Sequence, residues 1–354
     1  MFYLKYRPQT ISEIDNSRVK ELLKKILEGK SLPHALLFVG QKGSGKTSAA
    51  RIFAKAVNCL NNRFTPNHPN LPKSPNSFEP CNHCRHCLSI SASSFTDVVE
   101  LDAASNRGIE EIKNLIRETA FLPMVGRYRV FIIDEAHMIT PDGFNALLKT
   151  LEEPPKSAIF LLATTNLEKL PKTIASRCLK VNFGQGKIED IINMLKRICQ
   201  NENLKFKDEF LKLIARHSDH SFRDAAKILE EASIQNIASS SELENYLGIR
   251  GRTNLLEVIE KKDMKKTFAW VEEFSQSGGS FKNLIEEILE ELRLALLHKK
   301  GVLVDEIRST TLTIKEITKL IKLLMEAYQM LRSTPIDSLP LEIALNEFYN
   351  NKYV

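Results

Sequence analysis

The stretch GQKGSGKT, residues 40–47, has the residue types and spacing that bind the phosphates of a nucleotide. Gly43 and Gly45 allow the backbone to turn so that its amide groups face a β-phosphate. Lys46 places an ammonium group against the β- and γ-phosphates, and Thr47 offers a hydroxyl to Mg²⁺. An apolar strand before the stretch and a helix after it favour this interpretation over a chance glycine-rich turn. The cofactor-binding residues that we predict here are Gly40, Gly43, Ser44, Gly45, Lys46, Thr47 and Ser48.

An acidic pair follows a second apolar strand, in the stretch VFIIDEAH at residues 130–137. Ligands of open α/β sheets bind at the carboxyl ends of the strands, which is where Asp134 and Glu135 fall. We predict that Asp134 holds Mg²⁺, directly or through water, and that Glu135 polarises the attacking water. The alternative is an acidic strand end that caps the next helix, and the phosphate loop argues against it. The pair predicts hydrolysis as well as binding.

Three cysteines recur at every third position in PCNHCRHC, residues 80–87, of a chain with six cysteines. Cys81, Cys84 and Cys87 would need a fourth ligand to complete a tetrahedral Zn²⁺ site, and Cys59 is the natural candidate. His68, His83 and His86 compete for that place, although we expect His83 and His86 to point outward. Free cysteines on a turn and an iron–sulfur cluster remain alternatives.

Five short apolar runs alternate with helical segments over the first half of the chain. This alternation predicts a parallel α/β sheet. The expected strands are HALLFVG (34–40), DVVELD (97–102), YRVFIID (128–134), AIFLLATT (158–165) and CLKVNF (178–183). A helix is expected at 20–28 before the first strand, and helices between the strands at 47–57, 108–121 and 142–151. The Asn- and Pro-rich residues 60–80 are expected to form a loop.

After residue 183 the periodicity is helical throughout. We expect helices at 188–201, 207–217, 222–234, 281–298 and 314–331, with a polar link at 233–243. The pattern predicts an α/β domain at 1–184 with a zinc-binding insertion at 59–87, a small helical domain at 185–238 and a second helical domain at 239–354.

Composition limits the class of protein. The 354 residues are 43% apolar and carry a net charge of +6, which permits contact with nucleic acid without requiring it. No apolar run approaches the roughly 20 residues of a membrane span, and the first residues lack the core of a signal peptide. We therefore expect a cytoplasmic protein, in which reduced thiols favour metal binding over disulfides.

Several stretches together resemble the gamma/tau subunits of bacterial DNA polymerase III, the AAA+ ATPases of the sliding-clamp loader. They are YRPQT, GQKGSGKTSAARIFAKAVNC, PCNHCRHC, ELDAASNRGIEEI, VFIIDEAHMIT, FNALLKTLEEPP, FLLATTNLEKLP, SRC and SFRDA, in family order over about the first 230 residues. The resemblance implies an AAA+ P-loop ATPase domain with an inserted four-cysteine zinc module, a helical lid and a helical collar that assembles the ring. The gap from Cys59 to Cys81 is longer than is usual in the family.

The resemblance also assigns roles at matching positions. Tyr6, Arg7 and Pro8 match the segment that covers the adenine base. Thr165 matches the sensor of the γ-phosphate, and Arg223 matches a second sensor on the lid. Arg177 matches the arginine finger that reaches the ATP of a neighbouring subunit. Without the resemblance, each arginine would be taken as a surface charge and Thr165 as the end of a strand.

The resemblance therefore implies an ATPase that binds and hydrolyses ATP with Mg²⁺ to load the sliding clamp onto primed DNA during replication. Its implied partners are copies of itself and delta- and delta-prime-type subunits in a hetero-pentamer, the clamp and DNA. The holoenzyme is a nucleotidyltransferase, a DNA-directed DNA polymerase, but no polymerase site is expected in this chain. The alternatives are a zinc-containing scaffold or nucleic-acid binder without ATPase activity, and a clamp-loader small subunit of the archaeal or eukaryotic type.

Overall fold

The computed structural model describes residues 1–62, 64, 77–105, 108–247, 252–276, 279–301, 310–331 and 333–350. The chain divides into two compact units, Met1–Ile237 and Ala238–Val354. Within these described ranges, no helix combines the length and the apolar character needed to cross a membrane. The expected division at 184/185 lies inside the first unit and stays a prediction.

The first unit contains a five-stranded sheet in the order β2-β3-β4-β1-β5, and every neighbouring pair is parallel. The strands are β1 (Ala35–Gly40), β2 (Val98–Asp102), β3 (Arg129–Asp134), β4 (Ala158–Thr164) and β5 (Leu179–Gly184). The predicted parallel α/β sheet is confirmed. Because all strands run in one direction, their carboxyl ends share one edge, where β1, β3 and β4 deliver the predicted site residues.

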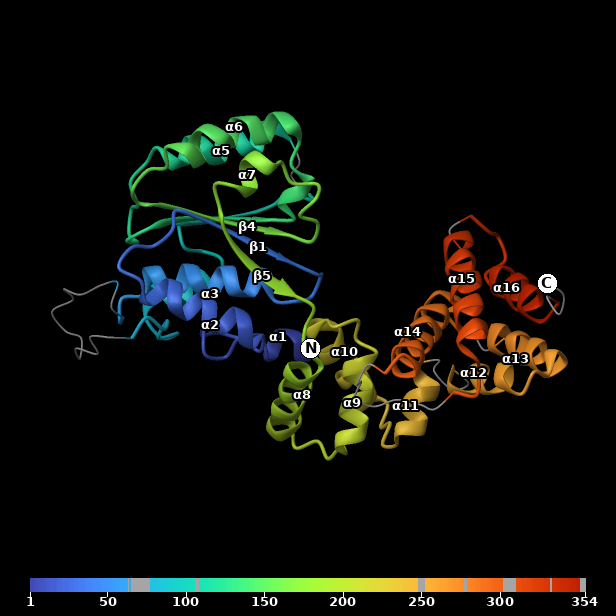
Figure 1. The fold of residues 1–354 in the computed structure, drawn as a ribbon. Coiled ribbons are helices and arrows are strands. Elements are labelled where there is room, and N and C mark those ends of the chain that lie inside the picture. The colour runs from blue at the N-terminus through green and yellow to red at the C-terminus, as the bar shows by residue number, and fades with distance from the viewer. Residues whose placement is uncertain are drawn as a thin grey trace. The chain divides into compact units, whose positions relative to one another are not determined.

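Helices cover both faces of this sheet, which explains why its central strands are apolar on both sides (Figure 1). Successive residues of β1 alternate between the faces: Leu36 and Phe38 pack with α2 (Ser17–Glu28) and α3 (Lys46–Asn58), whereas Leu37 packs on the opposite face. The helices of that opposite face are α5 (Ile109–Thr119), α6 (Pro141–Glu152) and α7 (Lys172–Ala175).

Further helices complete the first unit. Three helices follow the sheet, namely α8 (Ile188–Glu202), α9 (Asp208–Arg216) and α10 (Phe222–Ile234). Three short elements did not emerge from the sequence: α1 (Phe2–Lys5), α4 (Arg85–Ser91) and the 3₁₀ helix η1 (Ala136–Met138). The Phe2 amide donates to Glu230 on α10 over 3.0 Å, which fixes α1 against that helix. Most of the loop expected at 60–80 lies outside the described residues.

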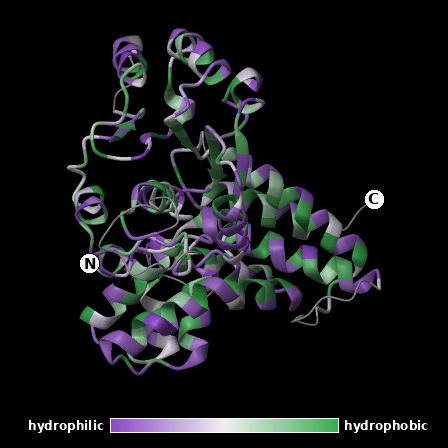
Figure 2. Cartoon of the chain, turned by 90° about the vertical axis from the view of Figure 1, so that its left-hand side faces the viewer, coloured by the Kyte–Doolittle hydropathy of each residue, from purple (hydrophilic) through white to green (hydrophobic). Residues whose placement is uncertain are grey.

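The second unit is helical in the part of the chain that the structure describes. Its helices are α11 (Ser240–Tyr246), α12 (Arg252–Glu260), α13 (Met264–Gln276), α14 (Phe281–Lys299), α15 (Ile314–Met330) and α16 (Leu339–Asn350). Apolar and polar residues are interspersed along the helices of the whole chain (Figure 2), and the apolar residues of the second unit build a separate core. The helix predicted at 314–331 contributes to it through α15, where Ile317, Leu320 and Leu324 are fully buried.

The polar link expected at 233–243 is wrong in part. The helix α10 runs to Ile234, and α11 already begins at Ser240. The Glu242 carboxylate accepts the amides of Ala238 and Ser239, and the Ser239 hydroxyl accepts the Glu242 amide. This reciprocal pattern is a capping box, which starts a helix inside a run of polar residues.

Candidate functional site

The phosphate loop joins β1 to α3 and depends on two residues with positive φ. Gly45 has a φ of +94° where α3 begins, and Gly43 has a φ of +77°. A Cβ atom on Gly43 would lie 2.0 Å from Ser221 Oγ, so a side chain here would be strained and would also collide with the start of α10. The loop therefore requires glycine where the phosphate pattern places it.

A pocket opens beside this loop, between α1, the end of β3, α8 and α10. The structure brings most of the predicted site residues into its lining: Tyr6, Arg7, Pro8, Gly43, Ser44, Gly45, Lys46, Thr47, Ser48, Asp134, Glu135 and Arg223. Gly40, Thr165 and Arg177 are not part of the lining. Sequence reasoning missed the apolar contribution of Ile14, Met194, Ile198 and Phe222, of which Met194 and Ile198 lie on the buried stripe of α8.

Lys46 is held against the loop that it completes. Its ammonium group donates to the carbonyl oxygens of Gly40 and Gln41 over 2.8 and 2.7 Å. Burial lowers the pKa of Lys46, and the nearby carboxylates of Glu135 and Asp134 oppose this shift. The ammonium can therefore exchange two carbonyl oxygens for phosphate oxygens without leaving the loop.

Ser44 provides a direct test of fit for a phosphate group. Its side chain is 3% exposed, and its Oγ has no hydrogen-bond partner among the described residues. A buried hydroxyl without a partner is costly unless a ligand or water satisfies it. Because this hydroxyl lies in the phosphate loop and lines the pocket, a phosphate oxygen is a suitable partner.

Oxygen ligands of the type that Mg²⁺ prefers meet across the loop. The Thr47 hydroxyl donates to Asp134 Oδ2 over 2.6 Å, which joins the start of α3 to the end of β3. Carboxylate and hydroxyl oxygens suit a hard divalent cation. Thr47 and Asp134 could therefore hold Mg²⁺ beside the phosphates.

Glu135 adopts the left-handed region, with φ 46° and ψ 44°, directly after β3. This backbone is uncommon for a residue with a side chain, and such positions concentrate at functional sites. The Glu135 carboxylate accepts a hydrogen bond from Thr165 Oγ1 over 3.0 Å. His137 Nδ1 lies 3.4 Å from the same carboxylate oxygen and 3.1 Å from Thr164 Oγ1. His137 did not emerge from the sequence, although it follows the acidic pair by two residues.

Cationic side chains surround the phosphate loop. The Arg7 Nε donates to Ser48 Oγ over 2.7 Å, which ties the N-terminal residues to α3. Burial lowers the pKa of Arg7, and the neighbouring Arg51 lowers it further. The Arg223 guanidinium lies 5.8 Å from the centre of the Tyr3 ring. With Lys46, these groups make a positively charged wall that suits an anionic ligand.

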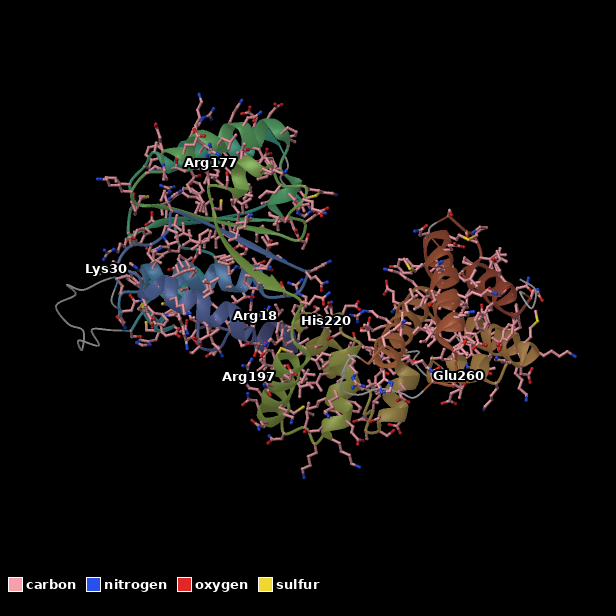
Figure 3. All side chains as sticks on the ribbon, viewed as in Figure 1. Arg18, Lys30, Arg177, Arg197, His220 and Glu260 are labelled. Carbon is pink, nitrogen blue, oxygen red and sulfur yellow. The ribbon has the colours of Figure 1, made fainter. Side chains whose placement is uncertain are left out.

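Arg177 lies outside the pocket of its own chain, beside α6 and α7 (Figure 3). Its guanidinium donates to the Thr173 carbonyl over 2.7 Å and forms an ion pair with Glu152. The structure therefore does not bring Arg177 to the nucleotide pocket of the same chain. A role at the site of another subunit stays a prediction.

The ligand sulfurs of Cys59, Cys81, Cys84 and Cys87 lie within 4.8 Å of one another. This is the four-thiolate set of a structural zinc site, so the cluster could hold zinc. A hydrogen bond from the Cys87 thiol lowers the pKa of Cys59 to about 5, which favours a thiolate in the group. His68 lies outside the described residues.

Backbone amides point at the cysteine sulfurs. Cys59 Sγ accepts the amides of Asn61 and Cys81, over 3.3 and 3.4 Å. In the same way, Cys81 Sγ accepts the Cys84 amide over 3.3 Å, and Cys84 Sγ accepts the Cys87 amide over 3.4 Å. Such donors stabilise the anionic thiolates that a metal needs.

The two histidines between these cysteines differ. His83 is exposed, as expected, but the expectation that His86 points outward is wrong, because that side chain is only 3% exposed. Its Nδ1 lies 2.8 Å from the Asn58 carbonyl, and its ring packs on Phe95. The short helix α4 turns His86 inward, and the three-residue cysteine repeat alone does not reveal that helix.

The parallel sheet with β4 between β1 and β3, the phosphate loop after β1 and the acidic pair after β3 define a P-loop fold of the AAA+ class. The chain belongs to the DNA polymerase III gamma/tau family. It is 35% identical over 362 residues to DNA polymerase III subunit tau of Bacillus subtilis (strain 168). The aligned region covers 97% of the chain and 62% of that relative. It is 34% identical to DNA polymerase III subunit gamma of Buchnera aphidicola subsp. Baizongia pistaciae, over 84% of the chain and 78% of the relative.

Two further comparisons match parts of the chain. A family described as DNA polymerase III, delta subunit, matches residues 15–187. The RuvB Holliday junction branch migration motor of Thermotoga maritima superposes with a TM-score of 0.48 at 18% identity, over 72% of the chain and 79% of that structure. The chain spans about three fifths of the length of the Bacillus subtilis relative.

Proposed function

We propose that this chain is an ATPase subunit of the clamp loader of bacterial DNA polymerase III, which uses ATP to load the sliding clamp onto primed DNA. One observation carries the proposal: Lys46, the Thr47–Asp134 pair and Glu135 line a single pocket, with Thr165 bonded to Glu135 behind them. A scaffold that had lost catalysis would have no need of this complete set. Membership of the gamma/tau family supports the same function.

The residues of the pocket have different roles in phosphoryl transfer. Loop amides and Lys46 bind the β- and γ-phosphates, while Tyr6, Arg7 and Pro8 cover the adenine base. Thr47 and Asp134 hold Mg²⁺, which neutralises charge on the phosphates when it is bound. Glu135 orients the attacking water and accepts its proton. Thr165 and Arg223 act as sensors of the γ-phosphate.

Hydrolysis would require a second subunit. Arg177 does not line the pocket of its own chain, so we propose that it stabilises the transferring phosphoryl group of a neighbour. The assembly would be a hetero-pentamer of copies of this chain with delta- and delta-prime-type subunits. It would act in the cytoplasm within the polymerase holoenzyme and grip DNA through phosphate contacts that weaken with salt.

The four cysteines are proposed to hold one structural Zn²⁺. All four ligand positions are protein sulfurs, which leaves no open position for a reacting group. The metal would therefore fix the fold around it and take no part in hydrolysis.

The proposal is tested by ATP hydrolysis in Glu135→Gln. The amide keeps the size of the side chain but cannot accept the proton, so hydrolysis should fall by about 10²–10⁴-fold while ATP binding is retained. Glu168→Gln is the matched control, because Glu168 is an exposed carboxylate three residues after Thr165. If Glu135→Gln hydrolyses ATP as fast as the control, the proposed role of this site is wrong.

A further inference from the structure

The cysteine module, which comprises Cys59 and the described residues 77–91, contacts the chain segment that borders the nucleotide pocket. Glu79, two residues before Cys81, accepts the amides of Ile11 and Ser12 over 2.7 and 2.9 Å. Both bonds go to one carboxylate, so they fix the position and the direction of this backbone. Residues 6–8, which line the pocket, precede these two amides by a few residues.

A second connection passes through α3. Lys55 on this helix donates to Gln9 Oε1 and to Asn82 Oδ1, each over 2.8 Å. Asn82 lies between Cys81 and Cys84, and Gln9 follows Pro8. One ammonium group therefore joins the cysteine loop, the N-terminal residues and the helix that carries the phosphate loop.

Lys55 is an unusual residue for this position, because its side chain is only 2% exposed. Its hydrogen bonds go to neutral amide oxygens, and the Glu13 carboxylate acts on it electrostatically without an ion pair among the described residues. A buried charge without a counter-charge is strongly unfavourable. A zinc ion with four thiolate ligands keeps a net negative charge, and Lys55 lies one helical turn before Cys59.

We propose that the cysteine module is a strut that holds residues 6–12 over the nucleotide pocket, with Glu79 and Lys55 as its positioning residues. The proposal rests on nucleotide binding in this pocket. The metal site then has a structural role in the nucleotide-binding domain. Zinc fixes the loop that holds Asn82, and the hydrogen bonds of Glu79 and Lys55 hold the segment with Arg7 and Pro8 in position. When the strut is lost, the covering segment is correctly placed for only part of the time.

The first test measures ATP binding to Glu79→Ala by calorimetry. If the covering segment is correctly placed for only about a tenth of the time, the apparent affinity falls about tenfold. Zinc content should stay at that of the unaltered chain, because Glu79 is not a ligand. Glu242→Ala is the matched control, since its carboxylate also accepts two successive backbone amides but lies in the second unit.

The second test separates positioning from general damage to the fold. Amide exchange of a peptide that covers residues 9–14 should become faster in Glu79→Ala and in Lys55→Gln, whereas peptides from β3 and β4 keep their protection. Removal of zinc from the unaltered chain, with Mg²⁺ restored afterwards, should weaken ATP binding to a similar extent. Zinc removal from Glu79→Ala should then weaken ATP binding only a little further, because both changes break the same connection.

The outcomes distinguish the strut from the proposed function. If Glu79→Ala and Lys55→Gln bind ATP as tightly as Glu242→Ala while Lys46→Ala has lost binding, the strut is wrong and the nucleotide site stands. If zinc removal and Glu79→Ala weaken binding additively, they act independently and the strut is also wrong. If the unaltered chain binds no ATP, the proposed function fails, and the strut fails with it.

Discussion

The Thr165 hydroxyl donates a hydrogen bond to Glu135 Oε2 over 3.0 Å, from the end of one strand to the end of its neighbour. A threonine hydroxyl has one proton, so it cannot donate to Glu135 and to a phosphate oxygen at the same time. A γ-phosphate that takes this proton would release the carboxylate to orient water. Sensing of the nucleotide and activation of the water would thus be coupled through one hydroxyl.

Thr165→Ala should therefore slow ATP hydrolysis by about 10²-fold, which is the lower end of the range for acid–base catalysis. ATP affinity should change little, because the phosphate loop and Lys46 remain. Thr165→Ser keeps the hydroxyl and should retain most of the activity, as measured by single-turnover hydrolysis. Equal impairment of Thr165→Ser and Thr165→Ala would show that the methyl packing, and not the hydroxyl, is what matters.

The cysteine cluster predicts one Zn²⁺ per chain, and Cys59→Ser should lose most of it. The loss follows because a hydroxyl is a much poorer zinc ligand than a thiolate. Cys199→Ser is the control, since Cys199 is buried but is not part of the cluster. Metal analysis of the purified chains provides the measurement. Full zinc in Cys59→Ser together with its loss in His68→Ala would assign the fourth ligand to the histidine.

Arg177 is predicted to act in trans. Arg177→Ala should leave ATP binding by its own chain intact and slow hydrolysis in the assembled complex by roughly 10³–10⁵-fold, as arginine fingers do. Arg117→Ala, which removes an exposed arginine on α5, serves as the control.

Mixing two inactive variants tests the trans assignment directly. A Lys46→Ala chain can lend its Arg177 to the phosphate loop of an Arg177→Ala neighbour, so some hydrolysis should return. If subunits exchange and no activity returns, the trans assignment is wrong. It is also wrong if Arg177→Ala alone prevents ATP binding by the isolated chain.

The second unit should lose stability in acid through Glu316. Hydrogen bonds from Lys262, and then from the Thr313 amide and hydroxyl, lower the pKa of Glu316 from 4.5 to about 2. Because the pKa is lower in the folded state, these bonds stabilise the fold fully above pH 4.5. Their contribution declines as the pH falls from 4.5 towards about 2, where the folded carboxylate takes up its proton.

Glu316→Gln should flatten this part of the stability profile, whereas Glu326→Gln, an exposed residue of the same helix, should not. Trp270 is the one tryptophan of the chain and packs on Phe274 in the second unit, so its fluorescence reports the unfolding of that unit. Urea unfolding between pH 2 and 5 provides the comparison. If the free energy of unfolding falls with decreasing pH as steeply in Glu316→Gln as in the unaltered chain, other groups cause the acid sensitivity.

Much of the site was predictable because its chemistry uses contiguous residues. The phosphate loop and the acidic pair are each one short stretch, and parallel strands place their ends at one edge of the sheet. The sequence also predicted the parallel sheet itself from five buried apolar runs. These features depend on local patterns that tertiary contacts reinforce.

The parts that were missed depend on contacts between distant residues. His137 and Thr164 come together only because β3 and β4 are neighbours, and no spacing in the sequence reports that distance. His86 turns inward through a helix of seven residues that Cys84 caps. The start of α11 was present in the sequence as Ser239 and Glu242, three residues apart, but a polar composition concealed it.

ATP hydrolysis in this pocket is proposed to drive a clamp loader, and one measurement tests this role most directly. ATP hydrolysis is measured with the clamp and partner subunits present, with and without primed DNA, for the unaltered chain and for Lys46→Ala. Primed DNA should stimulate hydrolysis by the unaltered chain. Lys46→Ala should bind ATP weakly and show no stimulation, because it lacks the ammonium that contacts the phosphates. Absence of stimulation in an assembled complex, or full stimulation with Lys46→Ala, would contradict the account.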